Sequence, residues 1–463
     1  MKSNVKILFF LGLIFSLFLV PAGAEYNTRG IPDSSEIRSK VSEIWFEAPC
    51  DTIRMLNSEI RMNSIGIPFQ IRLEEKEKQF FIIVAPQTKI NIDVYDRNGV
   101  HTEVENSYPG DVAGSWLLVR DKVSGKPVLI RYYFAKDSEV YVQFRPASKD
   151  TCFAELVMYG AYAAKGVPVG IPFDRFYTMS FSHVQSITAD TLLWKYTEGI
   201  PGLYDGVQTM VQVIRKNLPR LVYDEDAMYD EKGNPVSIET GRRRIIAEKY
   251  SGKLTLSSLG FIKWIADGIV EPLAGNYLKR VPLLVPTTEY RPTGFQGVLE
   301  QKNAISLGLD WTRNLAAAVM SVYNHRTYMY AESGVDVKIE PFASVLTDKG
   351  YENVSGYVKN SGYRPQILQP LLYALAASEP DYFYLAAIRQ TDMAKTEVKA
   401  FNQCAAIFPY FDEHGRFNAV VFMDGEELTL RNFLAAVGED KNMFVHLTRV
   451  KSSVKFYPQK PSL

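Results

Sequence analysis

The chain has 463 residues, 46% of them apolar and 22% charged, which is enough for two or three domains with full hydrophobic cores. Lysine plus arginine equal aspartate plus glutamate at 52 each, so the formal net charge is zero. No overall positive field then attracts nucleic acid or an anionic membrane surface. We therefore expect a globular protein that has no nucleic-acid partner.

The first 24 residues have the pattern of an export signal. Lys2 and Lys6 precede an apolar run over residues 7–20, which ends in Pro21-Ala22-Gly23-Ala24. This pattern predicts a signal peptide over residues 1–24, cleaved after Ala24, and the run is short for a membrane span. No later stretch approaches 18 apolar residues, so we expect an exported periplasmic or extracellular protein with no membrane span after cleavage.

Short runs of alternating apolar residues, separated by turn signals, follow a short expected helix at residues 37–46. This spacing predicts an antiparallel β-sandwich domain over residues 25–165. Residues 166–197 are interpreted as a connector. Export permits a disulfide, and Cys50 with Cys152 is the natural pair because both lie in this N-terminal part.

The C-terminal part, residues 166–463 with the connector, has a different order of elements. Helical spacing of apolar residues occurs at 206–218, 309–323 and 365–377, and a hairpin is expected over 405–422. Cys404 is expected to be a buried strand residue. Helices followed by antiparallel strands indicate an α+β fold.

Residues 254–268, LTLSSLGFIKWIADG, are the most informative stretch. Phe261, Ile262 and Ile265 recur at helical spacing, and Ser257 or Ser258 occupies the N-cap position. The positive end of a helix dipole helps to hold a cysteine there as a thiolate beside a histidine, whereas a serine gains little.

This stretch resembles the start of the catalytic helix in the NlpC-like cell-wall cysteine peptidases, which have a papain-like fold. Ser258-Leu259-Gly260-Phe261 matches a Cys-Ser-Gly-Phe run in that family, so Ser258 replaces the catalytic cysteine. Further similarity lies in residues 307–316, 372–385, 408–412 and 445–450, so that the resemblance covers roughly residues 190–455.

The resemblance also indicates which residues of this chain stand at the positions of the family's catalytic histidine and third polar residue. The family's histidine opens the strand before the Phe-Pro-Tyr-Phe block, and Gln403, or alternatively Asn402, stands there. The family's third polar residue comes from the following strand, where only Asn418 and Asp424 at its edges can serve. Glutamine cannot accept a proton, so these substitutions imply a pseudoenzyme.

The resemblance implies that the ligand is a peptidoglycan peptide or an envelope partner protein. The residues expected to line a remaining groove are Ser258, Gly260, Trp264, Asp310, Asn402 and Gln403. Asp310 and Arg313, one helical turn apart, are expected to form a local ion pair.

Two alternatives remain open. The first is an active cell-wall peptidase or amidase that uses Ser258 or another nucleophile, which requires a base within hydrogen-bond reach of Ser258. The second is a structural or adhesive envelope protein whose function resides in the sandwich. The five histidines are scattered without metal-ligand spacing, and no nucleotide-binding or nucleophile-elbow motif occurs, so no metal and no cofactor are expected.

Overall fold

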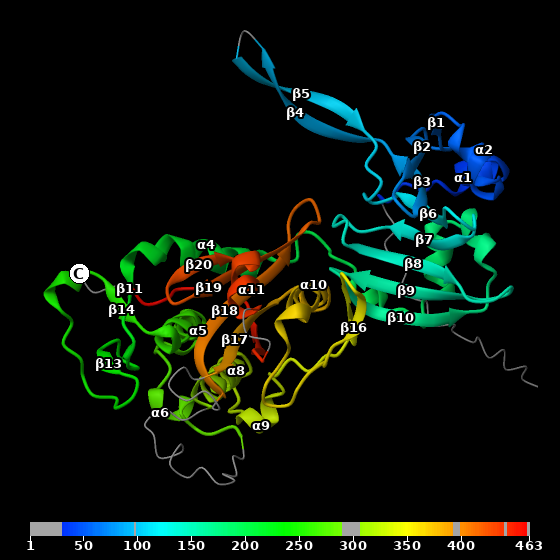
Figure 1. Ribbon diagram of the computed structural model, residues 1–463. Coiled ribbons are helices and arrows are strands. Elements are labelled where there is room, and N and C mark those ends of the chain that lie inside the picture. Colours follow the sequence, from blue (N-terminus) through cyan, green and yellow to red (C-terminus); the bar gives the residue numbers. More distant parts are fainter. Residues whose placement is uncertain (1–29, 97–98, 289–305, 392–398, 439–441, 461–463) are drawn as a thin grey trace, which may run out of the picture.

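The computed structural model describes residues 30–96, 99–288, 306–391, 399–438 and 442–460, so the predicted signal peptide lies outside the described residues. The fold is α+β, as predicted, with a β-rich N-terminal region beside a mixed C-terminal region (Figure 1).

The N-terminal region is built on one antiparallel sheet of ten strands, in the order β1-β2-β3-β6-β7-β8-β9-β10-β15-β16. The strands are β1 (Glu59–Met62), β2 (Pro68–Glu75), β3 (Gln79–Pro86), β6 (Trp116–Asp121), β7 (Pro127–Tyr133), β8 (Val140–Pro146), β9 (Cys152–Met158), β10 (Ala161–Val169), β15 (Ser344–Thr347) and β16 (Gly350–Asn353). The predicted antiparallel strands are confirmed, and all but the one at residues 90–95 lie in this single sheet.

Helices bury one face of this sheet, where a sandwich would place a second sheet. They are α1 (Ser35–Val41), the π-helix η1 (Ser42–Glu47), α2 (Cys50–Arg54), η2 (Phe173–Tyr177), α3 (Phe181–Ile187) and η3 (Trp194–Tyr196). The ring of Phe176 stacks 4.0 Å from that of Phe144, and the ring of Phe181 stacks 5.2 Å from that of Phe134. The segment interpreted as a connector therefore contributes to the N-terminal core.

A long hairpin of β4 (Thr88–Asp96) and β5 (Gly99–Ser107) projects from this region (Figure 1). Among the described residues its strands pair only with each other, and Tyr95, Val100 and Val104 are exposed on it. The hairpin therefore gains little stability from packing, and an isolated two-stranded ribbon is only marginally stable in water.

The two regions are joined through packed contacts. Strand β15, which comes late in the chain, pairs with β10, and the backbone N–H of Phe417 donates to the Asp137 carboxylate at 3.1 Å. The ring of Tyr159 packs 5.7 Å from that of Tyr373 and 6.0 Å from that of Phe417.

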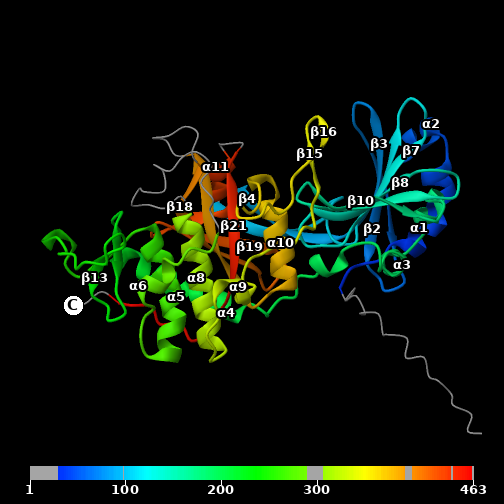
Figure 2. The same ribbon diagram turned by 90° about the horizontal axis from the view of Figure 1, so that it is seen from below.

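The C-terminal region contains a five-stranded antiparallel sheet in the order β20-β19-β18-β17-β21. The strands are β17 (Tyr382–Thr391), β18 (Lys399–Phe411), β19 (Phe417–Met423), β20 (Glu426–Thr429) and β21 (Phe444–Lys451). Helices α5 (Ser258–Ala274) and α8 (Leu307–Tyr323) lie on one side of it and α10 (Leu368–Ser378) on the other (Figure 2).

Smaller elements surround this core. They are α4 (Asp205–Asn217), η4 (Leu218–Arg220), β11 (Leu221–Tyr223), β12 (Ala227–Tyr229), β13 (Pro235–Ser237), η5 (Glu248–Tyr250), β14 (Leu254–Leu256), α6 (Arg280–Leu283), α9 (Tyr330–Ser333), η6 (Pro365–Ile367) and α11 (Leu430–Gly438). None of the helices in the described ranges is long and apolar enough to cross a membrane.

Cys50, Cys152 and Cys404 are all free thiols, so the predicted bridge between Cys50 and Cys152 is not formed. Cys50 lies beside Gly125 in the β6–β7 turn, whereas Cys152 opens β9, two strands beyond β7. Neighbouring strands are about 4.8 Å apart, so two strand spacings already exceed the roughly 7 Å that a disulfide spans between Cα atoms.

Candidate functional site

The site marked by the family resemblance begins at the N-terminus of α5. Strand β14 leads into Ser257, whose hydroxyl accepts a 3.0 Å hydrogen bond from the backbone N–H of Gly260 and so caps the helix. Ser258 is the first residue of the helix, and only 7% of its surface is exposed.

The Ser258 hydroxyl is bonded to the backbone of strand β18. It accepts from the Cys404 N–H at 3.0 Å and donates to the Cys404 carbonyl at 3.2 Å. Strand β19 ends at Met423, which pairs with Ala405, so Cys404 is the first residue of β18 beyond that ladder. The hydroxyl therefore satisfies the peptide groups that a continued β19 would have paired.

Asp424 follows Met423 in a left-handed backbone conformation, with a φ of 53°, and turns the chain away from the ladder. Burial raises the pKa of its carboxyl, and the nearby Ser258 hydroxyl partly offsets this rise. Among the described residues, nothing donates to its Oδ1 atom. Of the two predicted third residues, the structure brings Asp424 to Ser258, while Asn418 pairs with Tyr410 farther along the strand.

Gln403 does not share this site. It pairs with Ile388, whereas Cys404 pairs with Ala387, and successive strand residues point to opposite faces. The Cys404 thiol faces α8, with its Sγ 3.8 Å from the Gly308 carbonyl oxygen, so Gln403 lies on the face toward α10. Asn402 lies at the irregularity in the β17–β18 register. The predicted grouping of Gln403 with Ser258 is therefore wrong.

The chemistry available at this site is limited. A serine hydroxyl needs a neighbouring base, and the most effective bases have a pKa near neutrality. Burial raises the pKa of Asp424, but the hydroxyl hydrogen of Ser258 is already donated to the Cys404 carbonyl. Cys404 is fully buried, as predicted, and burial raises the pKa of its thiol, which makes thiolate chemistry unfavourable.

The other residues expected in a groove have structural roles. Trp264 is fully buried and its indole donates to the Gln459 carbonyl at 2.8 Å. Gly260 packs so closely that an added Cβ would lie 2.4 Å from the Ala227 carbonyl oxygen. Neither residue is therefore available to contact a ligand.

Asp310 is also structural, and its expected ion pair with Arg313 is not formed. The Asp310 carboxylate accepts from the backbone N–H and hydroxyl of Thr287, at 2.8 and 2.6 Å, and from the Ser306 hydroxyl at 2.7 Å. Arg313 instead forms a two-pronged pair with Asp336, at 3.1 and 2.8 Å. Tertiary packing therefore gives Asp310 and Arg313 other partners than each other.

A buried ionic cluster that sequence reasoning missed surrounds this pair. The Nε2 atom of His446, on β21, lies 3.5 Å from Asp336 and 3.3 Å from Arg313, and the Tyr330 hydroxyl donates to Asp336 at 2.8 Å. Asn360 accepts from Arg313 at 3.1 Å. Within the described part of the chain, the Nδ1 atom of His446 has no hydrogen-bond partner.

Burial and charge set the protonation states in this cluster. Burial lowers the pKa of His446 despite the neighbouring Asp336. The pKa of Asp336 falls well below its usual range because hydrogen bonds and charges from His446 and Arg313 outweigh burial. A sequence signal did exist, since Asp336 and His446 each interrupt an apolar run, which is typical of paired buried charges.

No group of histidine, cysteine and acidic side chains suited to a metal ion occurs within the residues that the structure describes. A family model described as a domain of unknown function (DUF8515) matches residues 27–196. This range covers the N-terminal region through η3 and none of the residues around Ser258. Comparison with curated proteins and with solved structures found no match.

Proposed function

We propose that the protein is an exported, catalytically inactive homologue of the NlpC-like cell-wall peptidases, which binds peptidoglycan peptides or an envelope partner without cleaving them. The resemblance around Ser258 supplies the ligand class. The signal-peptide pattern at the N-terminus supplies the location.

The observation that carries this proposal is the bonding of Ser258. Its hydroxyl has one hydrogen and two acceptor sites, and both Cys404 peptide groups engage it. His446, on the same face two strands away, has its Nε2 atom against Asp336 and Arg313, so no histidine shuttle serves Ser258. The position of the family's nucleophile thus holds a helix to a sheet.

The first test incubates the protein with purified peptidoglycan and analyses released soluble fragments by mass spectrometry. We expect no release, together with co-sedimentation of the protein with intact peptidoglycan. Two double variants, Ser258→Cys with Gln403→His and Ser258→Cys with Asn402→His, serve as attempts to restore the chemistry. Because Gln403 faces away from Ser258, we expect no release from the Gln403 variant, and the Asn402 variant tests the alternative alignment.

Release by the unmodified protein would contradict the proposal and support a hydrolase in which Asp424 assists Ser258. The matched control is then Asp424→Asn, which removes the only carboxylate found to act on Ser258 within the described ranges. Loss of release in that variant would identify the base.

The projecting β4–β5 hairpin favours a second candidate, a structural or adhesive envelope protein that acts through its N-terminal region. Exposed apolar residues on an otherwise unpacked ribbon are typical of a contact surface. Replacing residues 88–107 by a short glycine-serine linker separates the two candidates. Loss of all co-sedimentation supports the hairpin, and unchanged co-sedimentation supports the C-terminal region.

A further inference from the structure

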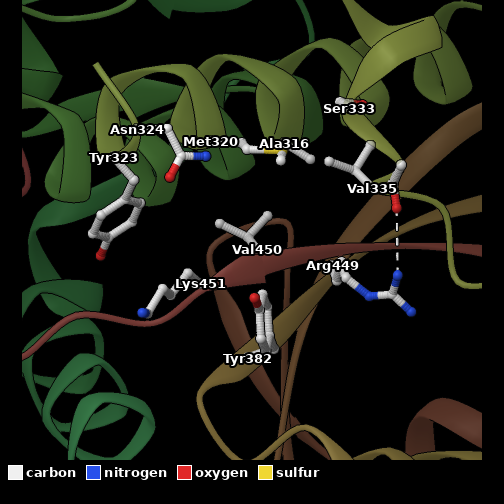
Figure 3. A pocket seen from close by; sticks show the side chains of 11 residues that line it. Ala316, Met320, Tyr323, Asn324, Ser333, Val335, Tyr382, Arg449, Val450 and Lys451 are labelled. Atoms are coloured by element: carbon white, nitrogen blue, oxygen red, sulfur yellow. Dashed lines mark hydrogen bonds between the residues drawn. The ribbon is translucent and has the colours of Figure 1, made fainter. Parts of the chain in front are cut away.

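A cavity of about 210 Å³ lies at the far end of the C-terminal sheet, between the second half of α8, the start of β17 and the end of β21 (Figure 3). Its apolar wall consists of Ala316, Met320, Val335 and Val450. This volume exceeds the roughly 150 Å³ of a cavity that holds benzene and is smaller than a typical drug site. One small molecule fits.

The rest of the lining is polar and cationic. Lys451 and Arg449 reach it from β21, and Asn324 and Tyr323 reach it from the end of α8 (Figure 3). Of the described residues, eleven line the cavity, and none of these is an aspartate or a glutamate. The cavity therefore presents hydrogen-bond donors and positive charge beside an apolar wall.

The two cations are not equivalent. Glu379 neutralises Arg449 through contacts at 2.9 and 3.0 Å, and Arg449 also donates to the Gly334 carbonyl at 3.3 Å. Lys451 is exposed and has no acidic partner among the described residues. One uncompensated positive charge at the mouth matches one negative charge on a ligand.

We propose that this cavity binds a small carboxylate that carries an apolar group, about the size of one amino-acid residue. Its carboxylate lies at Lys451 and Asn324, and its apolar group lies against Met320 and Val335. The same chemistry belongs to a free amphipathic acid and to the C-terminal residue of a peptide.

This site is separate from Ser258. Tyr382, which lines the cavity, pairs with Lys451, whereas Ala387 is the residue that pairs with Cys404. Five residues along a strand correspond to about 17 Å. The inference does not rest on the proposed function, because the cavity shares no lining residue with the site around Ser258.

The test uses the whole protein labelled with ¹³C at its methionine methyl groups, with the Met320 signal assigned through a Met320→Leu variant. The probes are N-acetyl-leucine, its uncharged amide, and acetyl-Gly-Gly-Leu. We expect a saturable shift of the Met320 signal with N-acetyl-leucine and at least tenfold weaker binding of the amide. Binding of acetyl-Gly-Gly-Leu indicates a peptide C-terminus, and binding of the small acid alone indicates a free acid; either result supports the proposal.

A charge variant with a matched control completes the test. Lys451→Met keeps the apolar stem and removes the charge, so we expect affinity for N-acetyl-leucine to fall roughly tenfold. Lys455→Met changes a nearby exposed lysine that does not line the cavity and should leave affinity unchanged. A Met320 signal that does not respond, equal affinity for acid and amide, or an unaffected Lys451→Met variant would each overturn the proposal.

Discussion

Two polar junctions connect the same face of the five-stranded sheet to its helices, and they differ in charge. At one, the neutral Ser258 hydroxyl joins α5 to Cys404 on β18. At the other, Arg313 on α8 meets Asp336 and His446, a closed network of ionisable groups. Cys404, Ala387 and His446 occupy facing positions on three adjacent strands, so the junctions lie two strands apart.

The comparison shows that titratable groups and a catalytic position need not coincide. The pKa values of Asp336 and His446 are both lowered, and these two groups contact each other and Arg313, so neither is free to act on a substrate. The position that resembles a nucleophile has only a hydroxyl bonded to backbone. Both junctions are therefore expected to act on stability, by different amounts.

The largest effect is expected from Arg313→Met. Removing the guanidinium leaves Asp336 buried without its main partner, which typically costs about 3–5 kcal/mol in the free energy of unfolding. Urea denaturation measures this loss. Arg215→Met removes an exposed pair with Glu427 and should cost less than about 1 kcal/mol; equal losses in the two variants would refute the buried network.

Gly308→Ala tests how closely α8 approaches β18. An added Cβ would lie 2.7 Å from the Phe401 carbonyl oxygen and 3.2 Å from the Cys404 Sγ, so we expect a loss of about 1–3 kcal/mol from overpacking. The matched control is Gly438→Ala, where nothing lies within 4 Å of the added carbon. The control should be neutral or slightly stabilising, because alanine favours a helix.

The lowered pKa of His446 predicts that the free energy of unfolding depends on pH. Its pKa in the folded state lies below its ordinary value of 6.5, so the unfolded state binds more protons and stability falls as the pH drops through 6.5. The maximum slope for one proton is about 1.4 kcal/mol per pH unit. Asp336 stays ionised between pH 5 and 7.5 because its pKa is lowered, and its stabilisation is lost only at more acidic pH.

The measurement is urea denaturation between pH 5 and 7.5, for the protein and for His446→Gln. The variant should lose the slope that His446 contributes. An identical pH profile for both proteins would show that His446 becomes protonated in the folded state as readily as in the unfolded chain.

The smallest effect is expected from Ser258→Ala. Without the hydroxyl, the Cys404 N–H and carbonyl lose their partner, at a cost of about 1–2 kcal/mol. Ser251→Ala changes an exposed serine in the loop before β14 and should be neutral. A Ser258→Ala protein as stable as the control would show that the hydroxyl does not complete the sheet.

The sequence by itself determined the local features of both junctions. Helical spacing of Phe261, Ile262 and Ile265 places α5 in the core, and the apolar run around Cys404 makes a buried strand. The sequence also placed the helix cap at Ser257 or Ser258, and the structure shows that it is Ser257. The antiparallel strands of the N-terminal region and the α+β class were likewise readable, because alternation and helical periodicity depend only on neighbours along the chain.

Tertiary structure alone decided the partners. Strand register placed Gln403 on the α10 face and Ser258 beside Asp424, and packing gave Arg313 to Asp336 in place of Asp310. It also kept Cys50 and Cys152 apart as free thiols. The physical reason is that local spacing sets which residues share a face of their own element, whereas the groups they meet depend on how separate elements dock.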